Sequence, residues 1–456
     1  MSVRERRVLV VGAGVTGLAA AVTLLDEPGV AVEVWEASGR VGGKLATSSF
    51  AGVPHVDEGA DAYLTRVPHA VAFADRLGLT GLTAPTAATA AVWHGRLHDI
   101  PGGIVLGLPA ELRPFVTTSL LSWRGKARAA FEPLLPRRDP DDSLGTLVRQ
   151  RFGDEVHERL VDALVGSIYA TDTDRSSLAA VPQIAAVASH HRSLLLGARA
   201  MRRATPPVPH AAIFAAPVDG MARLAEAAAD DVRRRGGLVR LGAGVDRLER
   251  DGDGWRVDDR RFDAVVIATP ARAAAMLLGE RAPDSAAALS AIEYADVLMV
   301  RLAVPAGSWP ERLHGRSGYL VPKPSQRLVT AASFGSQKWA HWRPADGTQI
   351  IRASLGRDGL AVRHLDDDAA IVHAVDDVGR HLDLDLQPAS HSVTRWLDGF
   401  PQYRPHHHTA VAAAEASLPN GIVLAGASYR GIGIPACIAD GQRAAALVSA
   451  ALTEVT

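Results

Sequence analysis

Residues 8–17 read Val-Leu-Val-Val-Gly-Ala-Gly-Val-Thr-Gly, and Glu36 follows nineteen residues after Gly17. The apolar run at residues 8–11 is typical of a strand buried in a parallel sheet. A helical stretch at residues 18–26 and a second strand pattern at residues 31–35 come next. This order of elements predicts a βαβ unit that binds a dinucleotide: a strand, a glycine-rich turn, a helix, a second strand and an acidic residue.

Each glycine of the turn has a physical role in such a unit. Gly12 permits the tight turn, Gly14 lets the backbone approach a pyrophosphate, and Gly17 lets helix and strand pack closely. The N-terminus of the helix offers free N–H groups and a partial positive charge to the phosphates. Glu36 is suited to accept hydrogen bonds from ribose hydroxyls and would repel a 2′-phosphate, which disfavours NADP.

A second glycine-containing loop follows the acid and bears on whether the nucleotide is NAD or FAD. Residues 37–44 read Ala-Ser-Gly-Arg-Val-Gly-Gly-Lys. Arg40 is suited to pair with a phosphate, and Gly42 and Gly43 allow close approach to a longer cofactor. This arrangement of acid, Arg and paired glycines resembles that of the amine-oxidase-like FAD superfamily and favours FAD. Residues 57–64 would form the next loop on the flavin side.

Composition narrows the classes of function. The 456 residues carry 49 Lys and Arg and 50 Asp and Glu, a net charge of −1, which gives no electrostatic argument for binding nucleic acid. The one cysteine, Cys437, excludes a disulfide framework and a cysteine-based zinc site within the chain, and we expect a cytoplasmic protein. Residues 8–25 are uncharged, but their glycine pattern argues against a signal peptide or membrane anchor. We expect at most peripheral membrane contact.

Hydrophobic periodicity and proline-rich segments divide the chain into three parts. We expect an FAD-binding domain at residues 1–90, 205–290 and 410–456, a helical insertion facing a membrane or partner at 91–204, and a substrate-binding sheet domain at 291–409. A proline-rich linker at 206–209 closes the insertion. Strand patterns at 297–304, 317–321, 327–333 and 349–355 and a helix at 366–381 mark the sheet domain. The predicted fold class is α/β: a Rossmann-like FAD-binding domain with a mixed-sheet substrate domain and a helical insertion.

The C-terminal segment returns to the first domain. Residues 421–427 form a strand pattern that ends in a glycine turn, and a helix begins near Ala436. Gly431 and Gly433 allow close approach of a ligand. The N-terminus of this helix could stabilise negative charge on a reduced flavin.

Three further motifs make the resemblance more specific. Residues 160–172, with Ile168-Tyr169-Ala170, the run Phe400-Pro401-Gln402-Tyr403 and the closing residues 431–441 resemble segments of the protoporphyrinogen and coproporphyrinogen oxidase family. The chain departs from that family at Ser167 and Thr171, where the family has Gly. It departs again at residues 406–408, three histidines in place of a Gly-His pattern, where we expect a local change of structure.

The resemblance implies non-covalent FAD held by a set of residues mapped motif by motif. These are Gly12, Ala13, Gly14, Val15, Thr16, Gly17, Glu36, Ala37, Arg40, Gly42, Gly43, Lys44, Gly59, Ala60, Asp61, Ala62, Val245, Trp396, Ile432, Gly433 and Ile434. It further implies oxidation of coproporphyrinogen III to coproporphyrin III, with O2 as acceptor and H2O2 as product. Protoporphyrinogen IX is an alternative substrate, and ferrochelatase is an implied partner.

No catalytic side chain is assigned, because the flavin N5 position would take the hydride. Arg66, Tyr169 and Tyr429 are the candidates for substrate contact, Arg66 for a propionate. Residues 406–408 lack the spacing of a helical metal site, and we expect no metal. A flavin amine oxidase or desaturase, and a non-catalytic FAD-binding partner protein, remain alternatives. The oligomeric state stays open.

Overall fold

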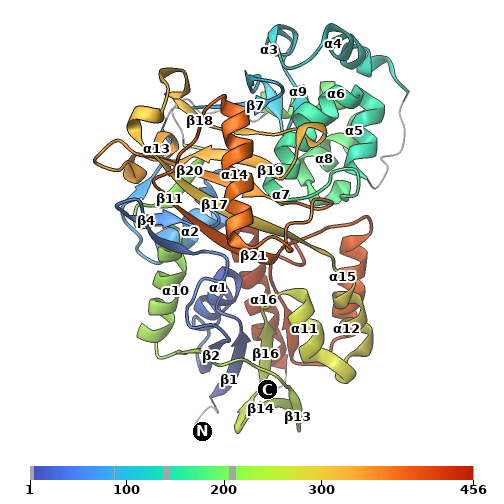
Figure 1. Cartoon of the computed structure of the whole chain (residues 1–456). Coiled ribbons are helices and arrows are strands. Elements are labelled where there is room, and N and C mark those ends of the chain that lie inside the picture. Colours follow the sequence, from blue (N-terminus) through green and yellow to red (C-terminus); the bar gives the residue numbers. More distant parts are fainter. Residues whose placement is uncertain (1–4, 87, 137–142, 205–211, 455–456) are drawn as a thin grey trace.

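Two large β-sheets and a lobe of helices form the computed structural model, which describes residues 5–86, 88–136, 143–204 and 212–454 (Figure 1). The smaller of the two sheets has five strands among the described residues, in the order β12-β2-β1-β16-β22, and all four pairings are parallel. Its strands are β1 (Arg6–Val11), β2 (Val30–Glu36), β12 (Leu238–Leu241), β16 (Ala264–Ile267) and β22 (Ile422–Leu424). The βαβ unit predicted from residues 8–36 is present.

Strand register places the glycine turn at the carboxyl edge of this sheet. Val11 lies opposite Trp35 on one side and Ile267 on the other. The chain therefore leaves β1 at Gly12, between the ends of two neighbouring strands. This edge is where parallel α/β sheets bind ligands.

Helices cover both faces of the parallel sheet. One face packs on α1 (Val15–Leu24), α10 (Ala222–Arg234) and α16 (Ile434–Glu454). The other packs on α11 (Ala271–Leu278), α12 (Pro283–Ser290) and α15 (His407–Ala416), with the antiparallel strands β13 (Glu249–Asp251), β14 (Gly254–Val257) and β15 (Arg260–Phe262). A Cβ at Gly441 of α16 would overlap the backbone oxygen of Thr16, so this glycine lets α16 cross close to the start of α1.

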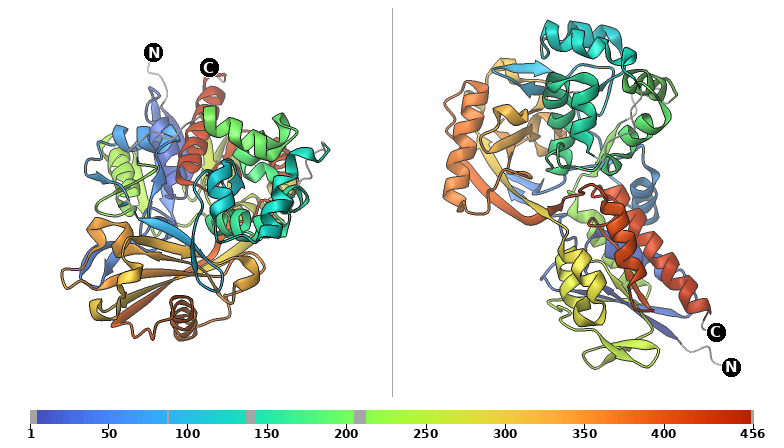
Figure 2. Two further views of the ribbon diagram at one scale, coloured as in Figure 1. Left: turned by 90° about the horizontal axis from the view of Figure 1, so that it is seen from above. Right: turned by 90° about the vertical axis from the view of Figure 1, so that its right-hand side faces the viewer.

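The larger sheet has seven strands in the part of the chain that is described, in the order β21-β17-β20-β19-β18-β7-β8. These are β7 (Thr89–Trp93), β8 (Leu97–Asp99), β17 (Tyr294–Val304), β18 (Arg316–Leu320), β19 (Val329–Phe334), β20 (Gln349–Leu355) and β21 (Ser390–Pro401). The pair β18–β7 is parallel and the other pairs are antiparallel. Helix α14 (Asp367–Leu382) packs on one face, as Figure 2 shows.

Two features of this sheet differ from the sequence expectation. β7 and β8 belong to it, although residues 91–99 were expected in the helical insertion. β21 is a long strand that no separate pattern predicted, because most of its side chains are half-buried or exposed and it lacks an apolar alternation.

The helical lobe lies beside the larger sheet, on the side away from α14 (Figure 2). It contains α3 (Leu112–Thr117), α4 (Trp123–Ala130), α5 (Leu144–Phe152), α6 (Asp154–Val156), α7 (Ser167–Tyr169), α8 (Pro182–His190) and α9 (Leu194–Ala204). The helix expected near residue 160 is a π-helix, η2 (His157–Gly166). The predicted linker at 206–209 lies outside the described residues.

Shorter strands join the two halves of the molecule. β3 (Thr47–Phe50) pairs with β4 (Val53–Asp57), and β11 (Phe214–Pro217) pairs with β5 (Tyr63–Leu64) and β6 (Leu82–Thr83), near helix α2 (Pro68–Arg76). Together with β17 and β21, they bring the carboxyl edge of the parallel sheet close to the larger sheet (Figure 1).

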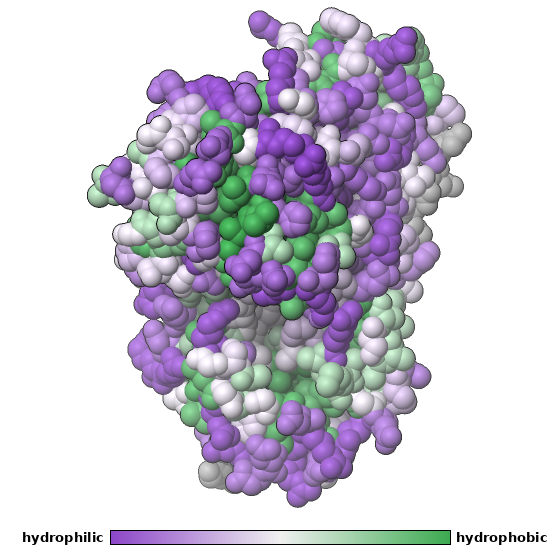
Figure 3. All heavy atoms as spheres, viewed as in Figure 1, coloured by the Kyte–Doolittle hydropathy of each residue, from purple (hydrophilic) through white to green (hydrophobic). Residues whose placement is uncertain are grey.

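No helix within the described ranges is long and apolar enough to cross a bilayer. On the face shown in Figure 3, apolar surface lies beside α14 in the upper half and is bordered by hydrophilic residues.

Candidate active site

The glycine turn after β1 is shaped by close backbone contacts. Gly12 has a φ of +104°, and a Cβ there would lie 2.9 Å from the backbone oxygen of Ala268. A Cβ at Gly17 would overlap the backbone oxygen of Gly12. A Cβ at Gly14, by contrast, would meet nothing within 4 Å. The turn thus needs two of its glycines for its own geometry, and the third leaves open space in front of the backbone.

The Glu36 carboxylate lies at this turn. Its Oε2 accepts a hydrogen bond from the Ala13 N–H at 2.8 Å, and its Oε1 accepts one from the Ser38 N–H at 2.9 Å. The Ala243 N–H donates to the backbone oxygen of Glu36 at 2.8 Å, which brings the segment containing Val245 beside the acid. Glu36 and the segment containing Val245 therefore lie next to each other beside the turn.

The second loop folds back onto the first. The Gly42 N–H donates to the backbone oxygen of Ala13 at 2.8 Å, and Gly14 and Gly42 form a parallel bridge. The Arg40 guanidinium donates to the backbone oxygens of Gly43 at 2.6 Å and Leu45 at 3.1 Å. Arg40 thus stabilises its own loop. We had expected Arg40 to pair with a phosphate and had not predicted these contacts within the loop.

Lys44 lies where both ends of the chain meet. Its neighbour Cys437, in the first turn of α16, hydrogen-bonds with Thr16 of α1. Burial raises the pKa of Cys437 to about 11, although Thr16 and Lys44 oppose the rise. Protein atoms around the Lys44 ammonium partly desolvate it and lower its pKa, although the residue is exposed to solvent. Lys44 has no hydrogen bond or ion pair to the rest of the described chain.

The loop at residues 59–62 is anchored by a buried carboxylate. Asp61 Oδ2 pairs with Lys338 Nζ at 2.8 Å and Arg352 Nη1 at 3.2 Å, and accepts a hydrogen bond from Trp339 Nε1 at 3.1 Å. Burial raises the pKa of Asp61, but the two cations outweigh it and hold the pKa well below its usual value. Asp61 therefore points to α13 (Gly335–Lys338) and β20, and the Arg352 guanidinium also donates to the backbone oxygen of Gly59.

Trp396 of β21 lies against this loop. A Cβ at Gly59 would lie 3.2 Å from the indole ring and 2.8 Å from the backbone oxygen of Lys44, so this close packing requires glycine. Trp396 also belongs to a small apolar cluster with Ala170, Ala295, Val297 and Phe400. This cluster joins the segment that follows the π-helix to the edge of the larger sheet formed by β17 and β21.

Residues 432–434 enter α16 directly beside α1. Ile434 packs into the core shared with that helix, and the Cys437 N–H donates to the backbone oxygen of Gly433 at 2.9 Å. Gly433 itself is exposed. Residues 12–17, 36–45, 59–62, 245, 396 and 432–434, far apart in the sequence, thus surround one region.

Two substrate candidates lie near each other. The Arg66 guanidinium is exposed and near the phenol of Tyr169, whose pKa is raised by burial while Arg66 opposes the rise. Ala170, the residue after Tyr169, has a left-handed φ of +47° and packs in the cluster with Trp396. Tyr169 itself packs against the core of the helical lobe, so this pair lies where that lobe adjoins the cluster.

The third candidate differs from the expectation. Tyr429 is fully buried in the core between the parallel sheet and α11, α12 and α15. The turn that follows β22 directs its ring away from the glycine turn and behind the sheet. Its side chain does not face open space where a substrate could touch it.

The histidine run, where we expected a local change of structure, lies at the start of a helix. His406 takes the left-handed φ of +66°, a conformation that glycine adopts freely, and His407 begins α15. Among the described residues, no group of three His, Cys, Asp or Glu side chains is arranged to hold a metal ion.

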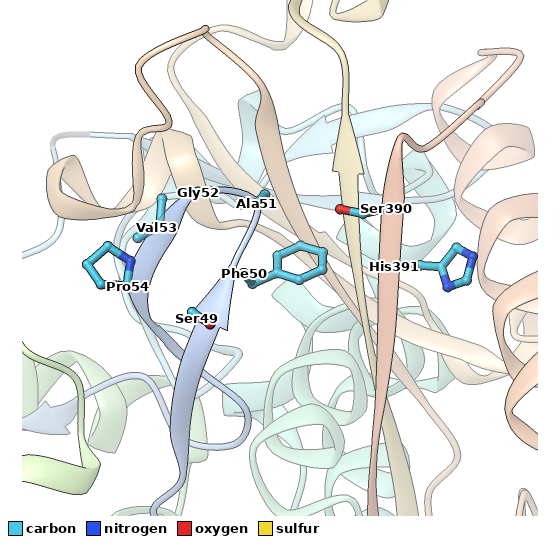
Figure 4. A pocket seen from close by; sticks show the side chains of 8 residues that line it. All are labelled: Ser49, Phe50, Ala51, Gly52, Val53, Pro54, Ser390 and His391. Atoms are coloured by element: carbon cyan, nitrogen blue, oxygen red, sulfur yellow. The ribbon is translucent and has the colours of Figure 1, made fainter.

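A separate depression lies away from this region. The β3–β4 hairpin and the start of β21 line it, through Ser49, Phe50, Ala51, Gly52, Val53, Pro54, Ser390 and His391 (Figure 4). It is open, and it lies at the Ser390 end of β21, far from the other end of that strand at Pro401.

The described residues fit a nucleotide diphosphate. Helix α1 begins at Val15, and its N-cap residue Gly14 provides no side-chain cap, so the first N–H groups of the helix are free for an anion. The space in front of Gly14 is open, and the Lys44 ammonium lacks an anionic partner in the described chain. Free donors, positive charge and backbone access together are the requirements of a pyrophosphate site.

Sequence reasoning missed several residues that build this region. Lys338 and Arg352, which hold Asp61, stand in strand and loop patterns with no motif around them. Tyr403 was noted only as part of a motif, although its hydroxyl contacts Gly431. Gly441 carried a usable signal, because a glycine inside an alanine-rich helix indicates close helix packing.

Fold and site together are those of a flavoprotein oxidoreductase. The chain belongs to the flavin-containing amine oxidoreductase family, whose model matches residues 15–449. This membership confirms the predicted fold class and the predicted FAD cofactor.

Among its relatives, the chain is 32% identical to coproporphyrinogen III oxidase of Bacillus subtilis (strain 168), with 99% of each chain covered. It is 34% identical to the enzyme of the same name from Mycobacterium leprae (strain TN), over 96% of this chain and 97% of that one. A solved structure from Exiguobacterium sp. 255-15, described as that of a candidate protoporphyrinogen oxidase, superposes with a TM-score of 0.86 at 28% identity and covers 99% of this chain and 100% of that one. The predicted resemblance to this group is confirmed.

Proposed function

We propose that this chain is an FAD-dependent oxidase that converts coproporphyrinogen III to coproporphyrin III, with O2 as acceptor and H2O2 as product. The observation that carries the proposal is the match to curated enzymes of that name along nearly the whole of both chains. A match of this extent includes the cofactor loops, the larger sheet and the helical lobe together.

The bound flavin would supply the two-electron acceptor for the meso carbon–hydrogen bonds of the substrate. The chain's own residues would bind and orient the macrocycle. The apolar cluster at Trp396 and Phe400 offers a wall for the pyrrole faces and excludes water. Because burial keeps the Tyr169 phenol protonated, it remains a hydrogen-bond donor at the edge of that wall.

Arg66 is the candidate partner for a substrate propionate. Its guanidinium is exposed beside Tyr169 and makes no ion pair with the rest of the described chain. Arginine binds a carboxylate with charge-assisted hydrogen bonds, which supports placing the polar rim of the substrate on this side.

One assay separates the candidate substrates. Purified holoenzyme in air is incubated with coproporphyrinogen III, protoporphyrinogen IX or a panel of primary amines, and porphyrin fluorescence and H2O2 are measured. We expect the fastest formation of porphyrin from coproporphyrinogen III. H2O2 from amines alone would instead indicate an amine oxidase. Porphyrin formation at the uncatalysed rate, with FAD bound, would indicate a non-catalytic protein.

Arg66→Ala tests the propionate contact. We expect about a tenfold rise in KM for coproporphyrinogen III with kcat little changed, since a hydrogen bond to a charged group contributes about 1.5–3 kcal/mol and 1.4 kcal/mol is tenfold. Arg124→Ala, which removes another exposed arginine from α4 in the helical lobe, is the matched control and should leave KM unchanged.

A further inference from the structure

We propose that Tyr403 is a positioning residue for the cofactor: its hydroxyl holds the turn at residues 427–431 and so sets the backbone of residues 432–434 beside the flavin. The part of this proposal that concerns turnover rests on the proposed function. The part that concerns the flavin does not.

The Tyr403 hydroxyl bridges the two ends of the turn. It accepts a hydrogen bond from the Gly431 N–H at 2.6 Å and donates one to the backbone oxygen of Ala427 at 2.7 Å. Gly431 has a φ of +131°, which glycine adopts and other residues rarely do. One side chain thus satisfies both backbone groups of a bend that leads into α16.

The ring of Tyr403 is held firmly. It stacks on His407 with ring centroids 3.9 Å apart and an angle of 12° between the planes, and Tyr403 is 7% exposed. Burial lowers the pKa of His407 to about 4, so the stacked imidazole is neutral. Burial likewise raises the pKa of Tyr403 well above its usual value, so the hydroxyl keeps its proton and donates to Ala427.

The backbone around Tyr403 is tied to the helical lobe and to two segments that flank strands of the larger sheet. Its backbone oxygen accepts a hydrogen bond from Ser177 of the helical lobe at 2.8 Å. Next to it, Arg404 pairs with Asp358, which follows β20 of the larger sheet, at 2.6 Å. The Gln402 N–H donates to the backbone oxygen of Glu293, before β17, at 2.8 Å. Tyr403 therefore holds the turn from a fixed point and does not merely move with it.

The turn determines how α16 meets the cofactor. α16 begins at Ile434, three residues after the clamped Gly431. The free N–H groups and partial positive charge of a helix N-terminus stabilise negative charge close to them, and the effect falls off within the first turn. A small displacement of residues 431–434 would therefore weaken FAD binding and lower the reduction potential of the bound flavin.

The test compares Tyr403→Phe with Tyr429→Phe in purified holoenzyme. Tyr429 is a matched control because it is a fully buried tyrosine within the same turn whose hydroxyl has no hydrogen-bond partner in the described chain. We expect Tyr403→Phe to bind FAD about tenfold more weakly, because a buried donor and acceptor left unpaired cost about 1–3 kcal/mol. We also expect a more negative midpoint potential of the flavin, measured against a reference dye, with Tyr429→Phe unchanged in both.

A purely structural role would lower the melting temperature without moving the flavin potential. A folded Tyr403→Phe with the wild-type FAD affinity and potential would overturn the proposal. If Tyr403→Phe does not fold, hydrogen exchange of the wild-type holoenzyme decides: the Gly431 amide must exchange more slowly than the Gly433 amide, and equal exchange rates would also overturn it. If the wild type did not oxidise porphyrinogens, the proposed function would be wrong. The flavin measurements would still test the role of Tyr403.

Discussion

The indole N–H of Trp396 donates a hydrogen bond to the backbone oxygen of Glu58 over 3.1 Å. This bond joins the middle of β21 to the loop before Gly59, although the two residues are 338 positions apart in the chain. It connects the larger sheet to a loop that surrounds the cofactor region.

We expect Trp396→Phe to weaken FAD binding a few-fold, because one hydrogen bond contributes about 0.5–1.5 kcal/mol and the aromatic packing is kept. Gly59→Ala should have a larger effect, since its Cβ would lie 2.8 Å from the backbone oxygen of Lys44. Fluorescence titration of the apoprotein with FAD measures both. Trp123→Phe, at a position 74% exposed on α4, is the control and should match the wild type.

Gly14 and Gly17 should respond differently to the same substitution. Gly17→Ala places its Cβ onto the backbone oxygen of Gly12, and we expect a loss of roughly 3 kcal/mol or more of unfolding free energy from the overpacked turn. Gly14→Ala meets no atom within 4 Å in the structure and has an ordinary φ of −68°. It should keep the stability of the apoprotein and bind FAD at least about tenfold more weakly, since its methyl group occupies space for the pyrophosphate.

Denaturant unfolding of the apoproteins and FAD titration separate these effects. Equal loss of stability in the two variants would contradict this assignment of Gly14.

His406→Gly should stabilise the protein. An L-residue in the left-handed region costs about 1–2 kcal/mol, and glycine costs about 0.5–1 kcal/mol more than alanine in conformational entropy, so we expect a net gain of about 0.5–1 kcal/mol. The His406 side chain is exposed, and α15 has no side-chain cap hydrogen bond at this N-cap position. Thermal unfolding of the holoenzyme measures the gain. His408→Gly, at an exposed position inside the same helix, should destabilise instead.

Asp57 should make stability depend on pH. Burial raises its pKa to about 6 from the usual 3.8 of an aspartate, although hydrogen bonds from Thr47 and from the Met221 N–H oppose the rise. Between these two values the folded state binds more protons than the unfolded state. This contribution to stability is therefore present at low pH and is lost as the pH rises from about 4 to about 6.

Asp57→Asn removes that titration while keeping the shape of the side chain. Between pH 4 and pH 7 the wild type should lose about 2–3 kcal/mol of unfolding free energy relative to Asp57→Asn. This estimate uses 1.36 kcal/mol per pKa unit. Urea unfolding at each pH measures it. Asp259→Asn, at an exposed position in the β14–β15 turn, controls for general effects of acid, and a parallel curve for the two variants would contradict the prediction.

The elements predicted best are those whose signal is local. The strand at residues 349–355 matches β20, and the helix at 366–381 matches α14 within one residue at each end. Both carry a complete periodic pattern with clear ends. β21 was not separately predicted because its partly exposed side chains carry no such pattern, and the π-helical geometry of residues 157–166 has no signature distinct from an ordinary helix.

The amino-acid sequence by itself determined the nucleotide turn of this protein. Steric access near Gly12, Gly14 and Gly17 depends on the absence of a Cβ, and Glu36 follows at a distance set by one strand–helix–strand unit. Only the tertiary structure decided that Tyr429 faces the core, that Asp61 pairs with Lys338, and that Tyr403 clamps Gly431. Tyr403 and Gly431 are 28 positions apart, and Asp61 and Lys338 are 277 positions apart. The burial of Tyr429 depends on which face of the sheet its turn meets. No local sequence pattern carries this information.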